Sequence, residues 1–145
     1  MKIWIINGPN LNLLGIRELE IYGNKGFEPF LQELREVFKG TEIGYYQSNI
    51  EGELVNMIQE VGVDPDCGGI VLNAAAYSHT SIAIADAVKA VPAPVVGVHI
   101  SNVLSREKER HHDLLGAYCV GGVQGLGFFG YKAALMYFLE GENAI

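Results

Sequence analysis

Short apolar runs alternate along the chain with segments in which apolar residues recur at helical spacing. Five runs occur, at Lys2–Asn7, Ile43–Gln47, Gly69–Asn73, Val95–Ile100 and Ala117–Val120. Continuous runs of this kind are typical of strands buried on both faces. Strands that alternate with helices predict a parallel sheet with right-handed crossovers and helices on both faces. We therefore predict an α/β, flavodoxin-like three-layer sandwich with a five-stranded parallel sheet of order 2-1-3-4-5.

Four segments between these runs have the three- and four-residue apolar spacing of helices. They are Phe27–Phe38, Glu51–Val61, Ser81–Val91 and Tyr131–Leu139. Gly40 is a candidate C-cap for the first helix, and a Ser or Thr near residue 80 is expected to cap the third.

Length and charge exclude several classes of protein. The 145 residues are typical of one domain, so we treat 1–145 as a single domain. The 10 basic and 17 acidic residues give a net charge of −7, which argues against nucleic acid as a partner. No apolar run reaches the ~18 residues of a membrane span, so no membrane association is expected. Cys67 and Cys119 indicate no disulfide framework, and a cytoplasmic location is expected.

Polar residues gather directly after the predicted strands, where ligands bind in sheets of this class. Three of the four arginines and two of the four histidines lie in these segments. A generic surface would scatter them over an acidic protein. Arginines grouped with Asn, His and Ser at one sheet edge predict a site for a small polar anion.

Each motif also has a purely structural interpretation when it is taken alone. Asn7–Asn10 is compatible with a tight turn, Arg17 with a solvated charge cluster and Ser78–Ser81 with a helix N-cap. His99 within an apolar run is compatible with a core histidine. Their joint placement on one edge of the sheet favours a functional site.

Several chemistries lack their sequence signatures. Gly125–Gly130 matches GxGxxG, but no second strand and acidic residue follow, so we interpret it as close backbone packing. There is no P-loop, no HExxH and no nucleophile motif, so neither cofactor nor metal is expected. Acid–base chemistry by His, Tyr, Arg and Asn remains, which suits proton abstraction beside a carbonyl or an elimination.

Four separate segments resemble the type II 3-dehydroquinate dehydratases over nearly the whole chain. They are Asn7–Gly15 followed by Arg17-Glu18 and Tyr22-Gly23, Gln47–Asn49 with Glu51-Gly52, Asn73–Ser81, and His99–Asn102 with Arg106-Glu107 and Arg110-His111. The resemblance implies a lyase of the shikimate pathway, which serves aromatic amino acid biosynthesis. Such an enzyme removes water from 3-dehydroquinate to give 3-dehydroshikimate through an enolate, without a Schiff base. It also implies a homo-oligomer of twelve subunits, arranged as a tetramer of trimers.

The resemblance assigns the catalytic roles to four residues. Tyr22 is expected to be the general base, and Arg17 the cation that makes its phenolate accessible, because free tyrosine titrates near pH ~10. Asn10 is expected to hold a water against the enolate oxygen. His99 is expected to protonate the departing hydroxyl.

Binding roles follow from the same resemblance. The side chain of Asn73 and the backbone amides of Ile100 and Ser101 are expected to hold the substrate carboxylate. His79 and Arg110 are expected to bind the ring hydroxyls. Asp86 matches a family residue that reaches the site of a neighbouring subunit.

The loop between Gly8 and Gly26 carries both Arg17 and Tyr22. We expect it to be mobile when the site is empty and to close over substrate, with Gly15 and Gly23 as hinges, because an enolate must be kept from water.

Three single positions and one short run depart from the family pattern. Gly97 replaces a glutamate two residues before the histidine, Leu19 replaces a proline, and Glu109 replaces an aromatic residue. Ala74–Ala76 stands where Pro-Gly-Ala or Ala-Gly-Ala is usual. The missing glutamate orients the histidine in the family, so another carboxylate or a water is expected to substitute here.

Two rival functions remain open at this point. The first is a non-catalytic flavodoxin-like module that binds a small hydroxylated carboxylate, which the glycine at position 97 favours. The second is a related carbon–oxygen lyase or an aldol-type enzyme acting on another keto acid. A Schiff-base mechanism is disfavoured because the lysines avoid the core of every strand-end motif.

Overall fold

Five parallel strands form a single sheet in the order β2-β1-β3-β4-β5, as predicted. The computed structural model describes residues 1–141, with only the backbone at Tyr22. The strands are β1 (Lys2–Asn7), β2 (Glu42–Gln47), β3 (Cys67–Asn73), β4 (Val95–His99) and β5 (Gly121–Gln124). The chain therefore has the flavodoxin-like strand order expected from its alternating pattern.

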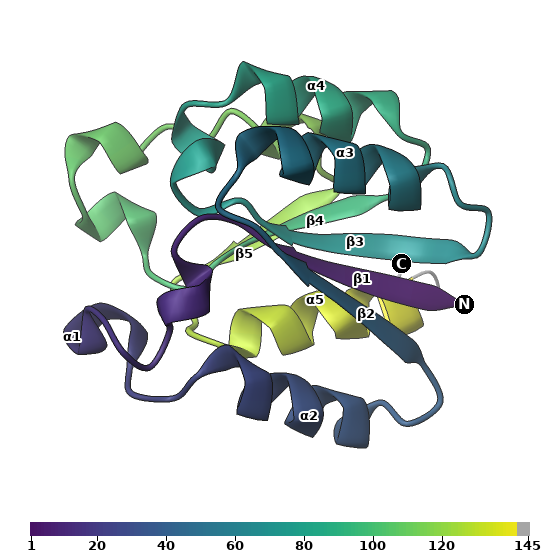
Figure 1. The fold of residues 1–145 in the computed structure, drawn as a ribbon, viewed down its shortest axis with the longest axis horizontal. Helices are drawn as coiled ribbons and strands as arrows, with labels where there is room; N and C mark the ends of the chain where they lie inside the picture. The colour runs from purple at the N-terminus through teal and green to yellow at the C-terminus, as the bar shows by residue number, and fades with distance from the viewer. Residues whose placement is uncertain (142–145) are drawn as a thin grey trace.

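Helices cover both faces of the sheet and complete three layers (Figure 1). One face packs on α3 and α4 and the other on α2 and α5, and a one-turn helix, α1, lies beyond the edge of the sheet. A hydrophobic core lies on each face of the sheet. Neighbouring residues of β1 contribute to both, since Ile5 packs on the α2 and α5 side and Ile6 packs on the α3 and α4 side. The helices are α1 (Leu19–Tyr22), α2 (Phe27–Val37), α3 (Glu51–Gly62), α4 (Ile82–Ala90) and α5 (Phe129–Glu140).

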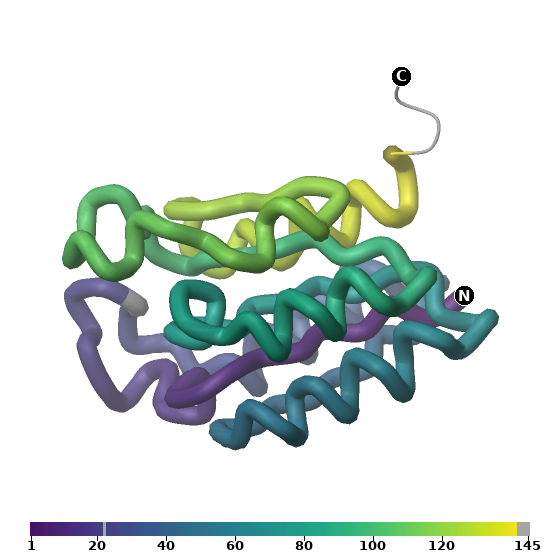
Figure 2. Tube along the Cα trace, turned by 90° about the horizontal axis from the view of Figure 1, so that it is seen from above, coloured from purple at the N-terminus to yellow at the C-terminus, as the bar shows by residue number. Residues whose placement is uncertain are grey.

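The strand register sets a row of polar residues at the carboxyl edge of the sheet. Asn7 pairs with Gln47 on one side and with Asn73 on the other, and His99 pairs with Gln124. Short 3₁₀ helices follow the strands at this edge, at η1 (Leu11–Leu13), η2 (Ala75–His79), η3 (Val103–Ser105) and η4 (Lys108–Arg110). Figure 2 shows the segment with α1 beside the segment with η3 and η4, at the end of the sheet away from the N-terminus.

Two sequence predictions are wrong in position. The fifth strand is Gly121–Gln124 and not Ala117–Val120, because residues 116–118 form a 3₁₀ turn, η5 (Gly116–Tyr118), before the chain pairs with β4. Helix α2 ends at Val37 with Phe38 as its C-cap, so Gly40 lies beyond the cap. The predicted N-cap is confirmed, since the Ser81 hydroxyl accepts the amide hydrogen of Ile84 at 2.9 Å.

The Gly125–Gly130 motif packs backbone against backbone, as interpreted from the sequence. The amide of Gly125 donates to the carbonyl of His99 at 3.1 Å, and that of Gly127 donates to the carbonyl of Ile100 at 3.0 Å. A Cβ at Gly130 would lie 3.2 Å from Val98 Cγ1. This segment therefore supports the end of β4, where predicted site residues lie.

Candidate active site

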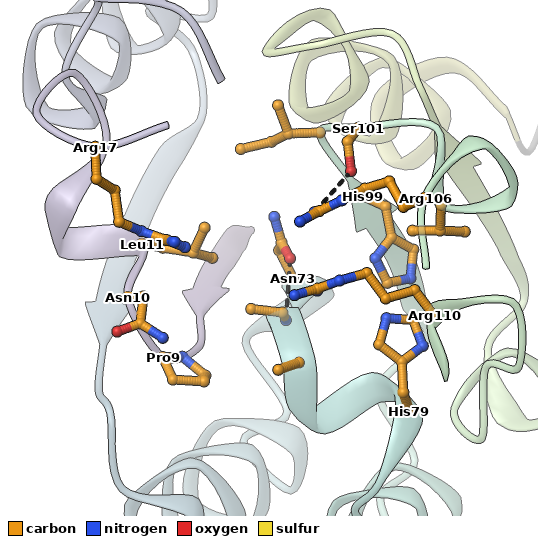
Figure 3. A pocket seen from close by; sticks show the side chains of 14 residues that line it. Pro9, Asn10, Leu11, Arg17, Asn73, His79, His99, Ser101, Arg106 and Arg110 are labelled. Carbon is orange, nitrogen blue, oxygen red and sulfur yellow. Dashed lines mark hydrogen bonds between the residues drawn. The ribbon is translucent and has the colours of Figure 1, made fainter. Parts of the chain in front are cut away.

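A polar cavity opens at the carboxyl edge of the sheet, between two walls (Figure 3). One wall, the loop wall, consists of Pro9, Asn10, Leu11 and Arg17 after β1. The other, the strand wall, consists of His79 after β3, His99 at the end of β4, and Ser101, Arg106 and Arg110 after β4. Asn73 lies between the two walls. Three arginines thus face one cavity, and none of its described lining residues is acidic.

Two stacked histidines form part of the strand wall. Their ring centroids lie 5.7 Å apart, with 19° between the ring planes. His79 Nδ1 lies 2.8 Å from the carbonyl oxygen of His112, so this nitrogen carries the hydrogen and donates it. Burial lowers the pKa of His79, with further lowering by His99 and Arg110, while His112 and Asp113 oppose it. At neutral pH, His79 is therefore a neutral ring whose Nε2 can accept a hydrogen bond.

The two arginines of the strand wall are held by polar partners. Arg110 Nε donates to a Glu107 carboxylate oxygen at 2.8 Å. Arg106 Nη1 donates to the Ser101 hydroxyl at 3.3 Å, and its Nε lies 3.7 Å from Glu107. Glu107 lies outside the cavity, so both guanidinium groups are oriented from behind while they line it.

Asn73 is fixed by a buried chain of hydrogen bonds. Its Nδ2 donates to the Tyr131 hydroxyl at 2.7 Å, and that hydroxyl donates to Asn7 Oδ1 at 2.9 Å. Asn73 Oδ1 accepts the amide hydrogen of Ala75 at 3.1 Å. Complete burial raises the pKa of Tyr131, which therefore remains a donor. The second Nδ2 hydrogen of Asn73 remains for a ligand.

The loop wall approaches β3 closely at its start. A Cβ on Gly8 would lie 2.5 Å from the carbonyl oxygen of Ala74, so only glycine fits there. Asn10 has a left-handed backbone with φ 67°, and its amide donates to Asn49 Oδ1 at 2.9 Å. Arg17 forms an ion pair with Glu18. The polar side chains of Asn10 and Arg17 are thus brought to the cavity by a loop and not by the sheet itself.

Eight of the ten residues predicted for the site line this cavity. They are Asn10, Arg17, Asn73, His79, His99, Ile100, Ser101 and Arg110. The other two are not among the described lining residues. Tyr22 ends α1, and its side chain lies outside the described residues. Asp86 lies on the exposed side of α4 and does not line the cavity of its own chain.

Two residues near the site had no assigned role in the sequence analysis. Arg106 was counted among the strand-end arginines without a role of its own, and it lines the cavity together with Arg110. Asp113 lies 14 residues after His99, in a segment without periodicity, yet its carboxylate contacts that histidine. No sequence pattern indicates this contact.

The described residues offer no metal centre. Within residues 1–141, no three His, Cys, Asp or Glu side chains are grouped so that they could hold a metal ion. In the same range, no helix is both long and apolar enough to cross a membrane.

Sequence comparison places this chain among known proteins. The profile of the family "Dehydroquinase class II" matches residues 1–139. The chain belongs to the class II dehydroquinases. The 3-dehydroquinate dehydratase of Campylobacter lari is 49% identical over 138 residues, which cover 94% of this chain and 85% of that one. That of Clostridium perfringens is 48% identical over 137 residues, 93% of this chain and 94% of that one.

A solved structure shows the same fold at high similarity. The type II dehydroquinase of Butyrivibrio crossotus superposes with a TM-score of 0.91 at 44% identity, covering 96% of this chain and 97% of that one. The resemblance inferred from the sequence is confirmed, as are the flavodoxin-like fold and the assignment to the hydro-lyase enzymes of the shikimate pathway.

The positions that depart from the usual dehydroquinase pattern leave the cavity intact. Arg110 lines it despite the neighbouring Glu109, because Arg110 pairs with Glu107. Ala75, where glycine is usual, adopts a left-handed backbone with φ 52° and donates to Asn73. At Gly97 there is no acid, but His99 Nε2 lies 3.2 Å from Asp113 Oδ2. A different carboxylate thus stands beside the histidine, as expected.

Proposed function

We propose that this dehydroquinase removes water from 3-dehydroquinate to give 3-dehydroshikimate, with Tyr22 as base and His99 as acid. The observation that carries the proposal is the cavity itself. Three arginines and two histidines of an acidic chain face one space without a described acidic lining residue, which suits a hydroxylated carboxylate. The described lining residues include no lysine, which supports elimination without a Schiff base.

Substrate binding is assigned mainly to the strand wall. The substrate carboxylate is bound by the Asn73 amide and by the backbone N–H groups of Ile100 and Ser101, at the end of β4. The ring hydroxyls are bound by His79 and Arg110. Support comes from the contacts that hold these groups before any ligand arrives, such as the Tyr131 hydroxyl on Asn73 and the Glu107 carboxylate on Arg110.

Proton removal is assigned to the loop wall. The Tyr22 phenolate takes a proton from the carbon beside the substrate ketone, and the Arg17 guanidinium favours the phenolate by its positive charge. Asn10 holds a water against the oxygen of the resulting enolate. Support comes from the side chains of Asn10 and Arg17, which line the cavity opposite the histidines (Figure 3).

Loss of the hydroxyl completes the reaction. The His99 imidazolium gives a proton to the departing hydroxyl, the carbon–oxygen bond breaks, and the enolate electrons form the new carbon–carbon double bond. Water leaves, and the products are a conjugated enone, a neutral His99 and a protonated Tyr22. The position of His99 across the cavity from the loop wall supports this assignment, because acid and base must act at different substrate atoms.

The segment between Gly8 and Gly26 is assigned the role of a lid over the substrate. Gly15 and Gly23 both have positive φ, at 85° and 77°, which other residues rarely adopt. Three apolar side chains of this segment, Ile16, Leu19 and Ile21, are 75%, 50% and 41% exposed. Closure over an occupied site would exclude water from the enolate.

Assembly into twelve subunits, as a tetramer of trimers, is part of the proposal. Asp86 is assigned to the cavity of a neighbouring subunit, near its Arg17. The support is the position of Asp86, which is exposed on α4 and takes no part in the cavity of its own chain.

The experiment that tests the function adds purified protein to 3-dehydroquinate and follows the ultraviolet absorbance of the enone. Wild-type protein is expected to produce the band without added metal or cofactor. Tyr22→Phe is expected to lower kcat by at least about 10²-fold, because it removes the base, while calorimetry detects binding at nearly unchanged affinity. Tyr137→Phe, an exposed position on α5, is the matched control and should turn over like wild type.

A second function is favoured by a single observation, the lack of an acid at position 97. It is a non-catalytic module that binds a small hydroxylated carboxylate in the same cavity. Binding of 3-dehydroquinate by folded wild-type protein without growth of the enone band would support this module and contradict the enzyme.

A further inference from the structure

The Asp113 carboxylate lies directly behind His99. Asp113 Oδ2 is 3.2 Å from His99 Nε2, and the His99 side chain is only 13% exposed. His99 borders two spaces. On one side is the cavity described above, which Asp113 does not line, and on the other is a second pocket bordered by His99, Asp113 and Gly97. Asp113 therefore contacts the histidine from the side away from the substrate.

Backbone hydrogen bonds hold this carboxylate in place. Asp113 Oδ1 accepts the amide hydrogens of Leu115 at 2.8 Å and Gly116 at 3.2 Å. Leu115 is itself buried in the core on the α3 and α4 side. Burial raises the pKa of Asp113, but the hydrogen bonds from His99, Leu115 and Gly116 outweigh it and lower the pKa overall. One oxygen is thus anchored to the backbone, and the other presents negative charge to the ring.

We propose that Asp113 is the positioning residue for His99, holding Nε2 so that Nδ1 delivers the proton to the departing hydroxyl. This role rests on the proposed function. A carboxylate accepts only, so Nε2 must carry a hydrogen, and Nδ1 is the ring nitrogen left for the substrate. The imidazolium can then donate from both nitrogens at once, to Asp113 behind it and to the hydroxyl in front.

The surrounding charges make this carboxylate important. Among the side chains that the structure describes, the other charged or titratable groups that line the cavity with His99 are the stacked His79 ring and the guanidinium groups of Arg17, Arg106 and Arg110, and none of them is acidic. Asp113 is a carboxylate in hydrogen-bond contact with this ring, so it supplies the acceptor that fixes Nε2 as the donor.

Gly97 leaves room for a direct test. Residues 97 and 99 lie on the same face of β4, because side chains alternate along a strand. A Cβ at position 97 would have Cys119 Sγ at 3.8 Å and the Gly121 carbonyl oxygen at 4.0 Å as its nearest neighbours, which are ordinary contacts. A longer side chain at this position enters the pocket that Asp113 and His99 share. A carboxylate can therefore be moved from position 113 to position 97.

The first variant is Asp113→Asn. Asparagine keeps the acceptor for Leu115 and Gly116 but presents an amide donor to Nε2, which reverses the tautomer and removes the charge. We expect kcat to fall by about 10²-fold with KM changed less than threefold, because Asp113 does not line the substrate cavity. Glu109→Gln, which removes a nearby exposed carboxylate, is the matched control and should retain wild-type kcat.

Deuterium exchange separates positioning from a general structural defect. In D₂O, an enolate formed by proton removal either loses its hydroxyl or takes up deuterium and returns to substrate. Weakening the acid slows only the first path, so Asp113→Asn should raise the ratio of deuterium uptake to enone formation by at least tenfold. This ratio does not depend on how much of the sample is folded, because the same active sites produce both rates. A structural defect lowers both rates and leaves the ratio unchanged.

A double variant that moves the carboxylate from position 113 to position 97 completes the test. Adding Gly97→Glu to Asp113→Asn should recover at least tenfold in kcat and bring the exchange ratio back toward the wild-type value. Unchanged kcat and exchange ratio in Asp113→Asn, with an active wild type, would overturn the role of Asp113 alone. A wild type that binds substrate without turnover would overturn both this role and the proposed function.

Discussion

The two walls of the cavity are built differently. On the strand wall, His79, His99 and Arg110 each have a hydrogen-bond partner behind them, in His112, Asp113 and Glu107. On the loop wall, Arg17 pairs with Glu18, its immediate neighbour in the chain, and α1 has a single turn. The two histidines of the strand wall are thus held from a segment far along the chain, and Arg110 from its own turn, whereas the ion pair of Arg17 with Glu18 lies within its own loop. This division suits an enzyme that must admit substrate before it excludes water.

The largest effect expected from the strand wall is on substrate affinity. Arg110→Gln should raise KM by roughly 10–100-fold, since a charge-assisted hydrogen bond contributes about 1.5–3 kcal/mol. The change in kcat should be smaller, in contrast to Tyr22→Phe on the loop, which lowers kcat. Steady-state kinetics on both variants measures the split.

Lys108→Gln removes one positive charge from the same η4 turn without touching the cavity, and it should leave KM within about twofold. A kcat loss without a KM change in Arg110→Gln would contradict the division between the two walls.

Stability should also differ between the walls. The buried Ser81 hydroxyl caps α4 directly after the segment that carries His79, whereas η1 and α1 have no side-chain cap hydrogen bond. Ser81→Ala should lower the free energy of unfolding by about 1 kcal/mol. Glu20→Ala in the exposed first turn of α1 should change it by less than about 0.5 kcal/mol. Urea unfolding of both variants tests the comparison, and equal losses would show that the walls are equally integrated into the fold.

The smallest effect concerns pH. Because burial lowers the pKa of His79, the unfolded chain binds a proton there more readily than the folded protein does. Stability from this group is therefore fully present above pH ~6.5 and is lost as the pH falls through the lower, folded-state pKa. The pKa of Asp113 is also lowered in the folded protein, so this carboxylate likewise contributes stability that is lost as the pH falls, at more acidic pH than for His79.

His79→Asn keeps a donor for the His112 carbonyl but does not titrate. When the pH is lowered from 7 to 5, the melting temperature should therefore fall less steeply in this variant than in wild type. An identical slope in the two proteins would mean that His79 makes no contribution in this range.

The sequence predicted most of the sheet and most of the cavity because both follow from local patterns. β1 is a continuous apolar run, and Asn73 and His99 end the strands that carry them. β5 was misplaced because Gly121–Gln124 is an exposed edge that pairs with β4 and needs no apolar run of its own. The contact of Asp113 with His99 depends on the path of an irregular loop. The glycine at position 97 therefore led us to expect another carboxylate or a water beside His99, but the sequence did not indicate which residue would supply it.

The buried chain Asn7–Tyr131–Asn73 has a consequence for the order of folding during synthesis. Tyr131 belongs to α5 and lies 58 residues after Asn73, whose side-chain amide donates a hydrogen bond to its hydroxyl. The ends of β1 and β3 emerge from the ribosome long before this hydroxyl does, and chains are made at about 5–20 residues per second. A nascent chain therefore has its sheet edge early but lacks the partner that sets the direction of the Asn73 amide. Ligand binding should therefore begin only when α5 has docked on the sheet and Tyr131 holds Asn73.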